Sequence, residues 1–196
     1  MPAFWGRRPK LPEETVDRLA ISLSATAATV SEMLLRDHNL PSDTPTYDLE
    51  WKIRAEVLAF LLHTVDRYAF ADCGPDFRQW LLDELTPVTV ELSLQMTFGD
   101  LDSAVEDRVY NWTLDRVADR DAEFGEFKYL TGDGRSEANF YTMNHVLGQC
   151  YRNICEHLSC DPDFFAYQKF GAGLVTLLAE QQIRGRVQRI AKVSGE

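Results

Sequence analysis

The sequence predicts an all-α fold, a single-domain bundle of about six helices. Apolar residues recur at helical spacing through most of the 196 residues, and helix start and stop signals bracket the periodic segments. The composition, 45% hydrophobic and 26% charged, is that of an ordinary globular domain. We expect residues 12–196 to form the domain and residues 1–11 to form an N-terminal arm.

The charge balance excludes some function classes. The net charge is −11 and the pI is about 4.8, so a protein that binds nucleic acid over its whole surface is not expected. The first residues lack the apolar core of a signal peptide, and no window is long and apolar enough to span a membrane. We therefore expect a soluble cytoplasmic protein. The cysteines are then reduced thiols: Cys73, Cys150, Cys155 and Cys160.

The N-terminal segments suggest contacts with other surfaces. Phe4 and Trp5 are adjacent aromatics near the terminus, and we expect them to dock onto the domain or onto a protein partner. The first helix is expected from Pro12 to His38. Small residues line one of its faces, which fits helix packing or self-association. These are Ser22, Ser24, Thr26, Thr29 and Ser31, among alanines.

The stretch from Tyr47 to Asp72 carries the densest apolar run, and we expect the other segments to cover it. At about 100° per residue, its apolar side chains occupy roughly half of the helix circumference, which is typical of a helix packed on several neighbours. They are Ile53, Val57, Leu58, Leu61, Leu62, Val65, Tyr68 and Ala69. A charged row of Glu56, His63 and Arg67, with Asp66 beside it, follows the other side.

The third segment has two competing interpretations. Cys73-Gly74-Pro75 ends the preceding helix and opens a new one. From Val88 to Phe98, however, apolar and polar residues alternate as in a strand, and Pro87 stands in front. A lone strand would leave its backbone groups unpaired. We therefore favour a helix kinked at Pro87.

Three further helices complete the predicted bundle. Ser103 begins one whose outer side alternates acids and arginines, which is typical of a solvated face. Ser136 caps the next, and Asp161-Pro162 caps the last. The basic residues from Arg184 to Lys192 suit a helix C-terminus better than a nucleic-acid tail in so acidic a chain.

Glu56, His63 and Asp66 are candidate metal ligands, because carboxylates and imidazole on one helix face can bind a metal or transfer protons. Helical di-iron proteins use Glu-x-x-His, and that motif does not occur in this sequence. We favour a solvent-facing or lightly buried network in which Glu56 and Arg67 flank His63, with no metal or other cofactor.

A six-residue motif provides a second candidate site. Arg152-Asn153-Ile154-Cys155-Glu156-His157 resembles the Arg-x4-His signature of HEPN domains, which are all-helical, usually dimeric and often ribonucleases. The resemblance implies that Arg152 binds phosphate and His157 serves in acid–base cleavage of RNA, with Asn153 at the polar position after the arginine. On an unbroken helix the Arg152 and His157 side chains diverge by about 140°, so we expect no RNA cleavage.

The sequence assembles no complete catalytic set. We therefore expect an interaction or scaffolding protein that acts as a homodimer. The alternatives are a HEPN-like ribonuclease using Arg152 and His157, and a metal-binding helical-bundle enzyme using Glu56, His63 and Asp66.

Overall fold

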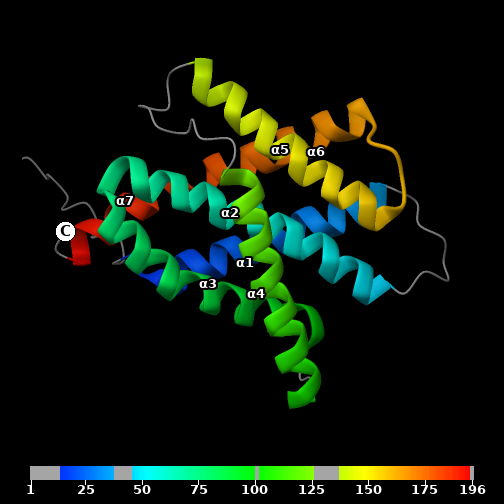
Figure 1. The fold of residues 1–196 in the computed structure, drawn as a ribbon, viewed down its shortest axis with the longest axis horizontal. Coiled ribbons are helices and arrows are strands. Elements are labelled where there is room, and N and C mark those ends of the chain that lie inside the picture. The colour runs from blue at the N-terminus through cyan, green and yellow to red at the C-terminus, as the bar shows by residue number, and fades with distance from the viewer. Residues whose placement is uncertain (1–13, 38–45, 100–101, 126–136, 195–196) are drawn as a thin grey trace, which may run out of the picture.

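The computed structural model describes residues 14–37, 46–99, 102–125 and 137–194. Those ranges hold seven α-helices and no strand, so the predicted all-α bundle is confirmed (Figure 1). The predicted N-terminal arm with Phe4 and Trp5 lies outside the described residues, as does the predicted cap Ser136. The helices are α1 (Val16–Asp37), α2 (Thr46–Cys73), α3 (Pro75–Phe98), α4 (Ser103–Gly125), α5 (Glu137–Leu158), α6 (Phe164–Glu180) and α7 (Ile183–Ser194).

Helix α2 is the centre of the bundle, as its apolar run predicted. It packs against α1, α3, α4, α5 and α7 (Figure 1). From Ile53 to Asp66 every side chain is buried, so polar and charged residues share the interior with the leucines. A helix surrounded in this way has no solvent-facing side on which charge can be placed.

The small residues of α1 serve packing within the chain. The Ser24 hydroxyl is buried and donates to the backbone carbonyl of Thr89 on α3, at 3.1 Å. Ser31 is also buried and bonds back to the carbonyl of Ala27. Small residues let the α1 and α3 backbones approach closely, so Ser24, Thr26 and Ser31 are buried within the chain, whereas Thr29 remains exposed.

Helix α3 continues through Pro87 to Phe98, and the strand alternative for Val88 to Phe98 is wrong. The alternating polar residues are accommodated within the helix. The Thr89 hydroxyl donates to the carbonyl of Leu85 at 2.7 Å, and the Thr97 hydroxyl donates to that of Ser93 at 2.7 Å. A hydroxyl that donates to a carbonyl of its own helix can be buried. The strand pattern, in which alternate residues face solvent, would place the same hydroxyl outside.

The predicted last helix is two helices. The chain leaves the helical path at Gln182, whose φ is +51°, before α7 begins. The N-cap of α6 is Asp163, not the predicted Asp161, because the Asp163 carboxylate accepts from the backbone N–H of Ala166 at 2.8 Å. Within the described ranges, no helix combines the length and apolar character needed to cross a bilayer.

The basic residues of α7 are used inside the bundle. Arg184 bonds both carboxylate oxygens of Asp72 on α2, at 2.7 and 2.5 Å. Arg186 reaches Glu14, and it also bonds the Ser22 hydroxyl and the carbonyl of Arg18 on α1. These arginines therefore attach α7 to the first two helices.

Candidate functional site

Glu56 lies at the centre of a buried ionic network that joins α2, α4 and α5. Its side chain is fully buried. Arg120 on α4 donates to both carboxylate oxygens, at 2.8 and 3.1 Å, and the imidazole Nε2 of His157 on α5 lies 3.1 Å from one of them. Arg120 also bonds Glu123, which accepts from the Asn153 side chain at 3.3 Å.

The partners of Glu56 keep its carboxylate charged in the interior. Burial raises the pKa of this group, but hydrogen bonds from His157 and Arg120 outweigh burial, so the net shift of the Glu56 pKa is downward. A buried carboxylate that accepts several charge-assisted hydrogen bonds is a satisfied structural group. The network therefore ties three helices together, and both oxygens of Glu56 have hydrogen-bond partners.

His63 and Asp66 form a separate cluster about two to three turns further along α2. His63 Nδ1 lies 2.9 Å from Oδ1 of Asp121 on α4. Asp66 is bound by the guanidinium groups of Arg67 on α2 and Arg78 on α3. The hydrogen bond with His63 lowers the pKa of Asp121. His63, Asp66 and Asp121 bring three possible ligand atoms within 4.8 Å of one another.

A cavity of about 190 Å³ adjoins this cluster, between α2, α3 and α4. His63, Asp66 and Asp121 line it, together with apolar side chains and Thr86. The side chain of His63 is only 2% exposed, and its Nε2 has no hydrogen-bond partner among the described residues. An unsatisfied buried ring nitrogen is unusual and needs an explanation.

The prediction of a solvent-facing or lightly buried row is wrong. Glu56, His63 and Asp66 are 0%, 3% and 1% exposed. The row also divides, because Glu56 turns toward α4 and α5 while His63 and Asp66 turn toward the cavity. Of the predicted metal set, the structure brings together His63 and Asp66 but not Glu56.

The two residues that complete these clusters, Arg120 and Asp121, were not predicted as site residues. They belong to the alternating acids and arginines of α4, a pattern that predicted a solvated face. One available signal was Glu56 itself, because a carboxylate among core residues requires a cation from another helix. Sequence spacing does not indicate which cation supplies it.

The Arg152, Asn153 and His157 motif is divided by the bundle. Helix α5 runs unbroken through all three residues. Arg152 is exposed, Asn153 is buried, and His157 turns inward to Glu56. The structure thus joins His157 directly to Glu56, a residue from the other predicted set. Asn153 is joined to Glu56 only through Glu123 and Arg120, and Arg152 lies outside. The absence of RNA cleavage stays a prediction, and among the described residues no contact brings Arg152 and His157 together.

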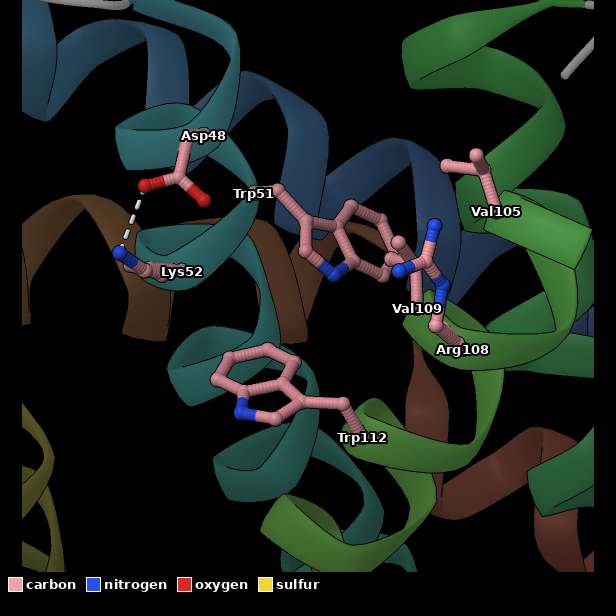
Figure 2. A pocket seen from close by; sticks show the side chains of 7 residues that line it. All are labelled: Asp48, Trp51, Lys52, Val105, Arg108, Val109 and Trp112. Carbon is pink, nitrogen blue, oxygen red and sulfur yellow. Dashed lines mark hydrogen bonds and ion pairs between the residues drawn. The ribbon is translucent and has the colours of Figure 1, made fainter.

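A second cavity, of about 340 Å³, opens between the N-terminal parts of α2 and α4. Figure 2 shows Trp51 and Trp112 projecting from these two helices into the space between them. Lys52 is paired with Asp48 at 2.6 Å, and Arg108 lies on the α4 side. The walls are mainly apolar and this volume is at the lower end for ligand sites, so the cavity suits a small apolar group.

Comparisons of the chain with protein-family models, curated proteins and solved structures find no match.

Proposed function

We propose that this protein is an interaction protein that acts as a homodimer and pairs through the outer face of α6. The single observation that supports the proposal is the exposure of apolar side chains on this helix. Phe164, Phe165 and Val175 are 63%, 78% and 51% exposed. We define the α6 face as these three residues together with the exposed Ala172 and Ala179.

The α6 face is continuous along the helix. At about 100° per residue, its five members fall within an arc of roughly 100°, and Gln168 lies inside the same arc. No acidic residue occurs between Asp163 and Glu180. The face therefore runs almost the whole length of α6 without a negative charge, on a chain whose net charge is −11.

A second copy of the chain is the partner that fits this face. Two molecules of net charge −11 repel each other, so a self-interface is favoured where the surface carries no acid. The large residues Phe164 and Phe165 stand at the start of α6, and the small residue Ala179 stands at its end. Antiparallel pairing about a two-fold axis places the phenylalanines of one copy against the alanine end of the other.

Among the residues that the structure describes, the other large exposed hydrophobic side chains are not concentrated on one helix as those of α6 are. They are single residues on four other helices: Ile21, Phe70, Trp80, Met96 and Val193. Scattered exposed hydrophobic residues are normal in soluble proteins. The proposal therefore assigns the interface to α6 rather than to α1, whose small residues already pack against α3 within the chain.

Sedimentation equilibrium over a range of concentrations tests the proposal. We expect the wild-type protein to be a reversible dimer, because one helix face buries less area than a standard permanent interface. Val175→Glu should shift it to monomer by placing a charge in the apolar contact. Met96→Glu is the matched control, because Met96 on α3 is 49% exposed, and it should leave the dimer intact.

Two results would contradict this proposal. One is a wild-type protein that remains monomeric at every concentration. The other is a Val175→Glu protein that dimerises as strongly as the wild type. Circular dichroism of each variant should match that of the wild type, since both side chains are exposed and outside the core.

A further inference from the structure

We propose that His63, Asp66 and Asp121 bind one divalent transition-metal ion at the wall of the cavity between α2, α3 and α4. This inference does not depend on dimerisation, because α6 contributes no residue to the cluster or the cavity. It rests on the positions of three ligand atoms, on an unsatisfied buried ring nitrogen and on the space beside them.

The ligand geometry is close to that of a metal site. His63 and Asp66 are three residues apart on α2 and so project from one side of the helix, and α4 supplies Asp121 from across the contact. Nδ1 of His63 and Oδ1 of Asp121 are 2.9 Å apart. Two atoms that are each about 2.1 Å from one tetrahedral zinc ion are separated by roughly 3.4 Å, so the two side chains need to move apart by only about 0.5 Å. An ion can therefore replace the proton shared by His63 and Asp121 without a large movement of either side chain.

The unpartnered nitrogen of His63 is an independent observation. The His63 side chain is 2% exposed and lines the cavity, yet its Nε2 has no hydrogen-bond partner among the described residues. A histidine buried for packing alone ordinarily has both nitrogens satisfied. With the ion on Nδ1, the ring proton resides on Nε2 and can be donated to a molecule in the cavity, such as water that accompanies the metal.

The charges around Asp66 determine how strongly a metal binds. Arg67 and Arg78 each bind this carboxylate, so two guanidinium groups balance the negative charges of Asp66 and Asp121. A carboxylate has about four lone-pair positions, and those that the arginines do not use remain open to an ion. The arginines hold Asp66 in place and also repel the cation. We therefore expect selective but moderate affinity, with one nitrogen and two oxygen ligands favouring zinc or manganese over calcium.

Calorimetric titration of chelator-treated, full-length protein with zinc chloride tests the proposal. We expect one ion per chain. Asp121→Asn should weaken binding by about 100-fold or more, since even outer-shell partners contribute 10–100-fold. Asp119→Asn is the matched control, because Asp119 is an exposed carboxylate on the same helix, and its affinity should equal that of the wild type.

A second measurement separates this site from the cysteines. Cobalt bound by His63 and two carboxylates should show d–d absorption without thiolate charge-transfer bands, and His63→Ala should remove that absorption. The Asp121 side chain is 47% exposed, so the Asp121→Asn protein remains informative if His63→Ala does not fold. The proposal is overturned if the wild type binds no zinc, if Asp121→Asn binds as tightly as the wild type, or if thiolate bands appear.

Discussion

At the scale of single residues, Glu56 shows how this bundle tolerates a charge in its core. Transfer of a carboxylate from water into a protein interior is costly unless it is paired and hydrogen-bonded. Here Arg120 contacts both oxygens, and His157 adds a third contact. The cost of burial is offset only while all three helices are in place, so the network favours one arrangement of α2, α4 and α5.

Glu56→Gln should destabilise the protein in a pH-dependent way. The pKa of Glu56 is lower in the folded protein than its ordinary value of 4.5. Its contribution to stability is thus fully present above that value and is lost as the pH falls toward the folded pKa. At pH 7 we expect the free energy of unfolding to fall by about 3 kcal/mol, measured by urea denaturation. The difference from wild type should shrink in acid.

Glu123→Gln is the control for this experiment. Glu123 also bonds Arg120, but its side chain is 29% exposed, so water can replace the lost contact. We expect a change below about 1 kcal/mol at pH 7. Equal losses from the two variants would contradict a dominant role for the buried carboxylate.

At the scale of helices, the sequence predicted the elements better than their polar contacts. The apolar sector of α2 identified the central helix, because a side chain buried on several sides leaves a broad periodic pattern. The same pattern could not show that Glu56, His63 and Asp66 are buried too. Their burial depends on Arg120 and Asp121 of α4, and a contact between distant helices leaves no periodicity in either segment.

The region from Val88 to Phe98, for which the sequence pattern allowed a helix or a strand, is helical. The alternating pattern counted Thr89 and Ser93 as exposed polar positions, but both are buried. The Thr89 hydroxyl donates a hydrogen bond to a carbonyl of its own helix. The backbone carbonyl of Thr89 accepts a hydrogen bond from the Ser24 hydroxyl. The Thr89 hydroxyl enters the helical interface in this manner, whereas the buried Ser93 hydroxyl has no hydrogen-bond partner among the described residues. A pattern that classes both residues only as polar predicts a strand.

Pro87→Ala should stabilise α3. Proline in a helix interior lacks the N–H that would bond to the carbonyl four residues earlier. Pro87 is exposed, so alanine can restore this bond without disturbing the core. We expect the free energy of unfolding to rise by about 1–3 kcal/mol, measured by thermal denaturation followed by circular dichroism.

Pro75→Ala is the matched control, because Pro75 occupies the first turn of the same helix. Proline is favourable there, since that N–H has no partner within the helix. The control should lower stability slightly or leave it unchanged. A loss of stability in Pro87→Ala would show that the proline shapes the contact with α1.

At the scale of the whole molecule, the terminal helix α7 completes the cover of the core. Its buried residues are Ile183, Val187, Ile190 and Ala191, and it packs on α2 and α1. The sequence predicts one helix across α6 and α7, because the break at Gln182 has neither glycine nor proline to mark it. The basic character of the segment was predicted, but its use in pairing with Asp72 and Glu14 was not.

A chain that stops at Glu180 should lose its fixed tertiary structure. Full burial of each large aliphatic side chain contributes about 1.5–3 kcal/mol to stability. The loss of Ile183, Val187 and Ile190 therefore approaches the free energy of unfolding of a whole domain, typically about 5–15 kcal/mol. We expect weaker near-UV circular dichroism and a broad unfolding transition. Arg184→Ala, which removes only the pair with Asp72, should unfold cooperatively. Unchanged cooperativity in the shortened chain would contradict the role assigned to α7.

The attachment of α7 to α1 also has a kinetic consequence. Arg186 and Glu14 are 172 residues apart in the chain, whereas α1, α2 and α3 are consecutive helices that contact one another. Contacts between consecutive helices close short loops, and contacts between distant segments form at a greater entropic cost. We therefore expect α1 to α3 to associate early in folding and α7 to dock late. In the native state, the amide protons of α7 should exchange with solvent before those of α2.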